Sequence, residues 1–175
     1  MNQKIGPSAP AFELFEMTPE LADVLGPAIA GIEPWVSLNF QPELMTAFMK
    51  NEDPALQRMA VFVDGVPAGV VAVRERWLRG PYLQLLALLP PYQGQGLGTA
   101  LLEWFAQQAG PYERWLWLCC SAFNSRALAF YQRNGYEQIA VLPDQIVDGM
   151  NELLLRKRGL QVYTTKAQCC PPGTE

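Results

Sequence analysis

Histidine is absent from this chain of 175 residues. Its imidazole is the side chain whose ordinary pKa lies closest to neutral pH, so its absence removes the usual proton acceptor of enzymes. Proton transfer near pH 7 would have to use other groups, such as carboxylates or water relayed through backbone carbonyls. Glu33 and Glu75 are the carboxylate candidates, although most acidic residues simply solvate a protein surface.

Cysteines spaced for metal binding or for a disulfide framework are also absent. The four cysteines form two adjacent pairs, Cys119-Cys120 and Cys169-Cys170. A zinc site needs cysteines separated by about two to four residues, and a disulfide framework needs them scattered along the chain. We therefore expect reduced thiols and no metal centre.

No apolar stretch is long enough to cross a membrane. The longest ones are interrupted by Gln84, Pro90 or Glu103, well short of the roughly 20 residues that a bilayer requires. The segment from Met1 to Pro10 lacks the apolar core of a signal peptide. We therefore expect a cytoplasmic protein with no membrane partner.

Net charge and chain length narrow the class of protein further. The net charge of −4 argues against nucleic acid as a partner and favours cationic substrates such as amines. At 175 residues, half of them apolar, the chain can bury one core without a second domain. The expected organisation is a mobile leader at 1–10, a single domain at 11–158 and a mobile tail at 159–175, as a monomer or a homodimer.

Apolar periodicity and turn signals predict a mixed succession of helices and strands. Thr18 followed by Pro19 marks a helix start, Asp64-Gly65 marks a hairpin turn, and Gly135 marks a helix end. Strands are expected at 11–17, 58–63, 68–77, 82–89, 115–119, 136–142 and 151–156. Helices are expected from Thr18, over 42–50, from Leu97 and from Asn124.

The stretch Gln93-Gly94-Gln95-Gly96-Leu97-Gly98 is the strongest functional signal in the chain. It joins the apolar run 82–89 to a helical pattern, so its backbone N–H groups and the helix N-terminus can face an anion together. A dinucleotide-binding loop would need an acidic residue about 20 residues later, and a kinase-type loop would need a lysine after its last glycine. Both are missing, so we expect a pyrophosphate on Gly94 to Thr99. A turn without a ligand is the alternative, but three closely spaced glycines at a helix start cost stability.

This loop has the form Gln-x-x-Gly-x-Gly, and it resembles the acetyl-CoA pyrophosphate motif of the GNAT family of N-acetyltransferases. The downstream signals of that family follow in the same order, namely the apolar run 115–119, Asn124, Tyr131 and then Asn134-Gly135-Tyr136. Glu33-Pro34-Trp35 and the stretch 117–131 are similar to the ribosomal-protein alanine acetyltransferases of the family. The resemblance covers most of 12–158 and is sharpest over 82–136.

The resemblance implies an α/β (α+β) fold with a mixed central sheet of about seven strands and helices on both faces. Two central parallel strands, at 82–89 and 115–119, would splay apart to admit acetyl-CoA as cosubstrate. The partner would be an unidentified amine acceptor. Its pocket would lie against the first two helices and the last hairpin, where Trp35, Phe40, Trp77, Tyr82 and Met150 are either lining or core residues.

The same resemblance implies roles for individual residues. The pantetheine arm would pair with the backbone of Leu86, Ala87 and Leu88, and the pyrophosphate would lie on Gln93, Gly94, Gln95, Gly96, Leu97, Gly98 and Thr99. Asn124 would hydrogen-bond the pantetheine, although an asparagine there could serve only as a helix N-cap. Tyr131 would contact the cofactor and protonate the departing thiolate, although it could instead be a core aromatic beside Phe130.

The proton acceptor does not follow from the resemblance. Two positions where the family carries a carboxylate fall on Cys119 and Gln84, and neither side chain can replace a carboxylate base. Cys119 as an acetylated nucleophile is an alternative, although a thiol in an apolar strand usually has a raised pKa. We expect direct attack of a neutral amine on acetyl-CoA in a ternary complex, with a preference for amines of low pKa. A non-catalytic acyl-CoA sensor and an acyl-CoA thioesterase remain as alternatives.

Overall fold

Seven strands and four α-helices make up the part of the chain that the computed structural model describes, residues 9–110 and 113–159. In chain order they are β1 (Glu13–Glu16), α1 (Pro19–Ala30), α2 (Pro42–Lys50), β2 (Leu56–Val63), β3 (Val66–Trp77), β4 (Gly80–Leu88), a short 3₁₀ turn (Pro90–Tyr92), α3 (Leu97–Gln107), β5 (Trp115–Ser121), α4 (Ser125–Arg133), β6 (Glu137–Pro143) and β7 (Asn151–Arg158). This succession confirms the predicted order of elements. The expected mobile leader and tail lie almost entirely outside the described residues, so their mobility stays a prediction.

Local signals in the sequence set several element boundaries. The Thr18 hydroxyl accepts a hydrogen bond from the Leu21 N–H at 3.3 Å, and Pro19 occupies the first helical position, so α1 begins where the cap predicts. Asp64 and Gly65 both have positive φ, 51° and 73°, as a two-residue hairpin turn between twisted strands requires. The predicted hairpin of β2 and β3 is therefore confirmed.

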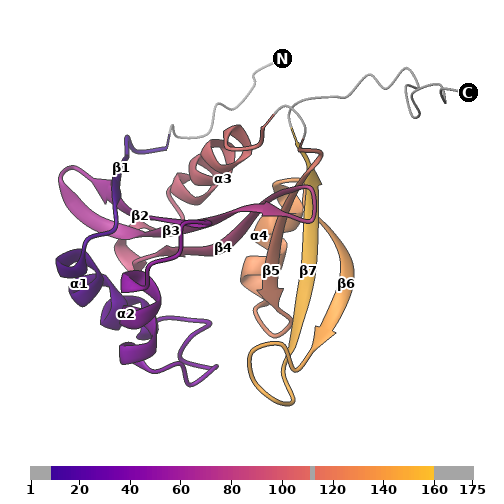
Figure 1. Ribbon diagram of the computed structural model, residues 1–175, viewed down its shortest axis with the longest axis horizontal. Coiled ribbons are helices and arrows are strands. Elements are labelled where there is room, and N and C mark those ends of the chain that lie inside the picture. The colour runs from indigo at the N-terminus through magenta and orange to yellow at the C-terminus, as the bar shows by residue number, and fades with distance from the viewer. Residues whose placement is uncertain (1–8, 111–112, 160–175) are drawn as a thin grey trace, which may run out of the picture.

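The strands form one sheet in the order β1-β2-β3-β4-β5-β7-β6 (Figure 1). Every neighbouring pair runs antiparallel except β4 and β5, which run parallel. Parallel neighbours need a crossover connection, and α3 supplies it between β4 and β5. The single parallel pair therefore lies at the centre of a mixed sheet, as the resemblance implied.

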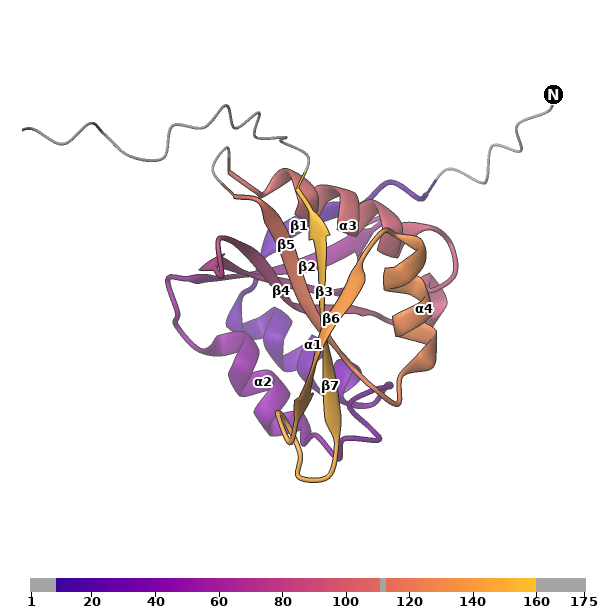
Figure 2. The ribbon, with the colours of Figure 1, turned by 90° about the vertical axis from the view of Figure 1, so that its right-hand side faces the viewer.

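The two faces of the sheet are covered by different helices (Figure 2). Leu25 and Ile29 of α1 are fully buried against Val70 of β3, and residues of α2 complete this layer. On the other face, α3 buries Phe105 completely against the central strands, and α4 packs beside it. Burying one such large apolar side chain stabilises the fold by roughly 1.5–3 kcal/mol, so the two layers hold the central strands in place.

The parallel strands β4 and β5 pair only at one end within the described residues. Tyr82 lies opposite Trp117 and Leu83 opposite Leu118, and beyond these pairs the strands diverge. Gln84 is an extra residue in β4, because Leu83 pairs with Val73 while Leu85 already pairs with Ala72. Such a bulge bends its strand and re-aims the neighbouring backbone, which accounts for the divergence of β4 from β5.

Candidate active site

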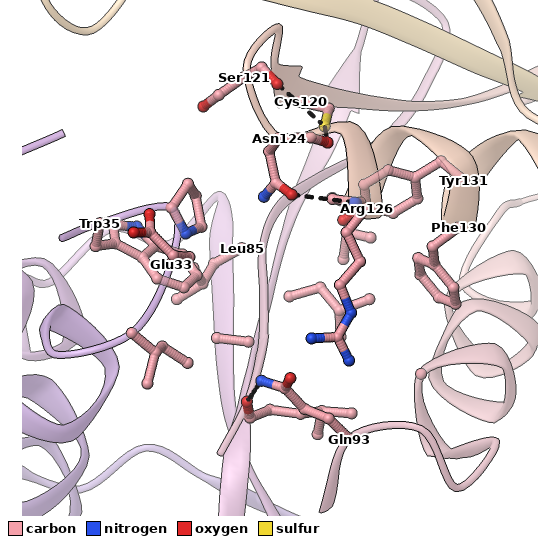
Figure 3. A pocket seen from close by; sticks show the side chains of 18 of the residues that line it. Glu33, Trp35, Leu85, Gln93, Cys120, Ser121, Asn124, Arg126, Phe130 and Tyr131 are labelled. Atoms are coloured by element: carbon pink, nitrogen blue, oxygen red, sulfur yellow. Dashed lines mark hydrogen bonds between the residues drawn. The ribbon is translucent and has the colours of Figure 1, made fainter. Parts of the chain in front are cut away.

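A cavity of about 690 Å³ occupies the gap between the diverging strands (Figure 3). Its walls come from β4, the glycine-rich loop, the start of α3, the end of β5, α4 and the segment between α1 and α2. Its lining mixes apolar side chains with a few polar and charged ones, which is typical of a substrate site. The cavity joins segments that are more than one hundred residues apart in the chain, from Ile32 to Glu152.

The glycine-rich loop adopts a conformation that requires two of its glycines. Gly94 and Gly96 have φ angles of 76° and 85°, in the left-handed region that other residues avoid. Gly96 is the N-cap of α3 and provides no side-chain cap, so no side chain of the described residues caps the first N–H groups of the helix. Unpaired N–H groups and the positive end of the helix dipole suit a phosphate at this place.

Gly98 has a packing role that the sequence did not indicate. It lies one residue inside α3, and a Cβ there would come within 3.1 Å of the Phe130 ring of α4. The missing side chain therefore lets α3 and α4 approach closely beside the cavity. Gly94, in contrast, has no atom of the described residues within 4 Å of the place of its missing Cβ.

Hydrogen bonds of two glutamine side chains hold the loop against the end of β4 and the 3₁₀ turn that follows it. The Gln93 Nε2 donates to the Leu88 carbonyl at 2.7 Å, and the Gln95 Nε2 donates to the Pro91 carbonyl at 2.6 Å. Gln95 does not line the cavity, and Leu97 is fully buried in the core, so only their backbones could face a ligand. The structure brings the other residues implied by the resemblance together along the cavity, namely Leu86, Ala87, Leu88, Gln93, Gly94, Gly96, Gly98, Thr99, Asn124 and Tyr131.

Asn124 combines the two roles that the sequence left open. Its Oδ1 accepts a hydrogen bond from the Ala127 N–H at 3.1 Å, so the side chain is the N-cap of α4. Its Nδ2 faces the cavity (Figure 3). The amide N–H groups are therefore available to a ligand and would donate to a carbonyl oxygen.

Tyr131 lies on α4 and lines the cavity with one side of its half-buried ring. Its other contacts are Phe130, with ring centroids 5.2 Å apart, and Tyr136, at 6.0 Å. Burial raises the pKa of the Tyr131 hydroxyl, and the neighbouring Cys120 and Tyr136 act in the same direction. The phenol therefore stays protonated at neutral pH and can donate its proton.

Arg126 and Arg133 line the same cavity from α4 and were not predicted. They are two helical turns apart and therefore share a face of α4. Once the helix was predicted, this spacing could have indicated from the sequence that the two arginines lie together. Figure 3 shows the Arg126 guanidinium extending between Asn124 and Gln93. Two cations beside the glycine-rich loop suit the phosphates of a nucleotide-containing substrate.

The opposite wall of the cavity comes from the segment between α1 and α2. Glu33, Pro34 and Trp35 line it, and the Glu33 Oε1 accepts a hydrogen bond from the Ser37 hydroxyl at 2.9 Å. Of the five residues considered for an acceptor pocket, only Trp35 lines the cavity. Trp77 and Tyr82 instead pack on each other, with ring centroids 4.8 Å apart.

The two positions that lack a carboxylate have other partners. The Gln84 Oε1 accepts from the Arg74 Nε at 3.1 Å, at the bulge of β4. Burial raises the pKa of the Cys119 thiol, while a hydrogen bond with the Tyr82 hydroxyl partly opposes the shift. Cys119 is therefore a neutral thiol, and Glu75 is exposed on β3 outside the cavity lining.

Glu152 is the acidic residue that sequence reasoning missed. It lies on β7 directly opposite Ser121 of β5, it is only 4% exposed, and it lines the cavity. Burial raises the pKa of its carboxyl group, and a hydrogen bond with Ser121 partly opposes the shift. Four consecutive residues of β7, from Glu152 to Leu155, are buried, so the strand has no alternation that could have indicated this position from the sequence.

Two observations on the described residues concern metal binding and membrane-spanning helices. No group of three or more potential metal ligands occurs at 9–110 or 113–159. In the same residues, no helix has the length and apolarity needed to cross a bilayer. The glycine-rich loop and the diverging strands line one cavity, as the resemblance to acetyltransferases implied, and the two arginines line it with them.

The chain belongs to the GNAT family of acetyltransferases, and acetyl-CoA is its cosubstrate. A sequence model of the Acetyltransferase (GNAT) family matches residues 27–136, which include the glycine-rich loop, Asn124 and Tyr131. A search of curated protein sequences finds no significant match. The family assignment therefore rests on the family model together with the fold.

Solved acetyltransferase structures share this fold. An acetyltransferase from Thermus thermophilus is 22% identical with a TM-score of 0.69, covering 86% of this chain and 98% of that one. The ribosomal-protein-S18-alanine N-acetyltransferase from Escherichia coli is 17% identical with a TM-score of 0.65, covering 90% and 99%. Ard1 from Thermoplasma volcanium is 19% identical with a TM-score of 0.67, covering 86% and 99%. At these identities the likeness shows the fold alone.

Proposed function

We propose that this acetyltransferase passes the acetyl group of acetyl-CoA directly to an amine within a ternary complex. The observation that carries the proposal is one continuous cavity that two substrates can share. The glycine-rich loop and β4 line one part of it, and the segment with Glu33 and Trp35 lines another. Holding both reactants in one site removes much of the entropic cost of their encounter.

Each part of acetyl-CoA has a proposed place in this cavity. The pyrophosphate lies on the loop and the start of α3, with Arg126 beside it. The pantetheine pairs with the backbone of Leu86 and Ala87 as an added strand would, and with the Asn124 amide. The Leu88 carbonyl already accepts from Gln93, so this end of β4 is held rather than free.

The thioester then lies where β4 and β5 diverge. Backbone N–H groups of β4 just beyond Leu83, which β5 leaves unpaired, stabilise the negative charge that develops on the carbonyl oxygen. The Tyr131 hydroxyl hydrogen-bonds the departing thiolate and gives its proton to the sulfur as the carbon–sulfur bond breaks. Burial keeps this phenol protonated until that step.

Direct attack by the amine is favoured over a covalent acetyl-enzyme. Two thiols among the described residues line the cavity, Cys119 and Cys120, and burial raises the pKa of both and keeps them neutral. A neutral thiol is a poor nucleophile compared with a thiolate. The two cysteines therefore serve as a wall of the cavity.

Release of CoA thiol from acetyl-CoA, with and without a mixed panel of amines, tests the proposal. Amine-dependent release, with an acetylated amine found by mass spectrometry, is the expected result. Release that ignores the amines would instead indicate a thioesterase. Tight binding of acetyl-CoA with no release would indicate a sensor.

A further inference from the structure

We propose that Glu152 is the proton acceptor of this acetyltransferase and takes the proton that the amine nitrogen loses as it bonds to the acetyl carbon. The inference rests on the proposed transfer to an amine. It concerns a position on β7, whereas the two positions at which the resemblance implies a carboxylate hold Cys119 and Gln84. Glu152 on β7 would thus provide the carboxylate that those positions on β5 and β4 lack.

Strand register brings Glu152 to the site. It lies opposite Ser121 in the antiparallel pair of β5 and β7, and its neighbour Leu154 lies opposite Cys119. Side chains directly opposite each other on one face have Cβ atoms about 4.5–5.5 Å apart, so Glu152, Ser121 and Cys119 share one surface. This surface lies at the open end of the β4–β5 gap, and all three residues line the cavity.

Glu152 has no cationic partner among the residues described at 9–110 and 113–159. The ion pairs there join other residues, and Arg126 and Arg133 line the cavity beside the loop without pairing to it. The polar groups facing it are the Ser121 hydroxyl, the Cys119 thiol and the Tyr82 hydroxyl, and the Cys120 thiol lies nearby on the other face of β5. Tyr131 on α4 and Glu33 from the α1–α2 segment line the same cavity.

Burial without a cation is an unfavourable environment for a carboxylate, and few proteins retain one without a reason. The desolvation raises the pKa of Glu152 above its ordinary value of 4.5. A base is most effective when its pKa approaches the working pH, because it is then both ionised and able to hold a proton. The burial that weakens the fold here therefore improves the residue as a base.

The transfer step balances with the groups present. The amine nitrogen bonds to the acetyl carbon, the carbon–sulfur bond breaks, and the nitrogen proton passes to the Glu152 carboxylate. The departing thiolate takes the Tyr131 proton. Exchange with water then returns Glu152 to its carboxylate form and Tyr131 to the phenol, so the net products are the acetylated amine and CoA thiol.

The first test is the pH profile of kcat/KM for the whole chain, with acetyl-CoA and the best amine from the panel. Glu152→Gln should lower kcat by about 10²-fold or more at pH 7.5. It should also remove the acidic limb of the profile, which is the decrease of kcat/KM at low pH as the base becomes protonated. The acetyl-CoA dissociation constant should change less than a few-fold. Glu75→Gln, which removes an exposed carboxylate outside the cavity lining, is the control and should keep both the rate and the limb.

A second variant leaves the carboxylate in place. The Ser121 hydroxyl lowers the pKa of Glu152, so Ser121→Ala should move the acidic limb of the wild-type profile to higher pH. A residue with a merely structural role would not produce this shift. The measurement also serves if Glu152→Gln fails to fold.

The outcomes separate the inference from the function on which it rests. Wild-type protein that acetylates no amine would overturn both. Wild-type turnover together with a Glu152→Gln variant that keeps its rate and its acidic limb would overturn only the role of Glu152. An unshifted limb in Ser121→Ala, in a folded and active protein, would do the same.

Discussion

Tyr131 and Tyr136 are in ring contact, with centroids 6.0 Å apart and planes at 70°, yet their hydroxyl groups have different surroundings. Tyr131 lines the cavity, whereas Tyr136 is 3% exposed and its hydroxyl has no hydrogen-bond partner among the residues that the structure describes. The two residues also differ in position, since Tyr131 is within α4 and Tyr136 follows the helix end. They therefore form a matched pair for the same substitution.

Tyr131→Phe should lower kcat by about 10²-fold or more, because it removes the proposed proton donor and keeps the ring. The acetyl-CoA dissociation constant should change less than a few-fold. Tyr136→Phe should keep full turnover and equal or higher thermal stability, because it removes a buried hydroxyl that has no partner. Normal turnover by folded Tyr131→Phe would place the acid elsewhere.

The glycine-rich loop can be tested at Gly94. Gly94→Val should weaken acetyl-CoA binding by well over tenfold, more than about 1.4 kcal/mol, because a side chain in the left-handed region strains the loop and covers its N–H groups. Titration calorimetry measures this effect. Gly65→Val is the control, since Gly65 has nearly the same φ, 73° against 76°, and equally open surroundings in the β2–β3 turn. Equal affinities in the two variants would remove the loop from the site.

Arg126 should contribute to binding through the phosphates. Arg126→Ala should raise the dissociation constant of acetyl-CoA by about tenfold, as expected for a charged hydrogen bond. Its affinity for acetyl-pantetheine, which has no pyrophosphate, should stay the same. Arg114→Ala is the control, because Arg114 lies over the Trp115 ring, outside the cavity lining. A similar loss for both ligands would mean that Arg126 does not act through the phosphates.

The acceptor should be an amine of low pKa. Deprotonating a lysine-like amine of pKa about 10.4 at pH 7 costs roughly 4.6 kcal/mol, against about 1–1.4 kcal/mol for an α-amine. A carboxylate acceptor does not remove this cost, because its own pKa stays far below that of lysine. α-Amino groups, amino sugars and aryl amines should therefore outperform lysine side chains in kcat/KM. A clear preference for ε-amines would imply a site that lowers the amine pKa by other means.

Glu152 should also make stability depend on pH. Its pKa is higher in the folded chain than the ordinary value of 4.5, so its contribution is most favourable below that value and is lost as the pH rises through the folded pKa. Glu152→Gln has no charge to bury. Its melting temperature should therefore match the wild type near pH 4 and exceed it at pH 8, and added salt should not abolish the difference. A constant difference across this range would contradict the raised pKa.

Local signals were sufficient for the elements and for the loop. Thr18, Asp64-Gly65 and Asn124 act through hydrogen bonds and backbone angles within a few residues, and each marks a boundary that the structure has. The loop at 93–98 is equally local. Its position at the diverging strands followed from the family resemblance rather than from periodicity.

Glu152 could not be found in the same way, because its burial depends on register between distant strands. Asn151-Glu152 at a strand start is typical of a solvated end, and only the pairing with Ser121 brings the carboxylate into the cavity. The bulge at Gln84 is another long-range effect, since it exists only relative to β3. Gly98 likewise acquires its packing role from Phe130, on a different helix.

The short parallel pairing of β4 and β5 also affects how easily the gap between these two strands can widen. The antiparallel pair of β5 and β7 is joined along the whole of β5, from Trp115 to Ser121, whereas β4 and β5 are joined near Tyr82 and Leu83. A force that separates the two parts of the sheet therefore acts on a joint at one end and swings the other end open. The width of the cavity is therefore easier to change than the spacing of β5 and β7, and a bound pantetheine arm would act as a spacer that fixes it.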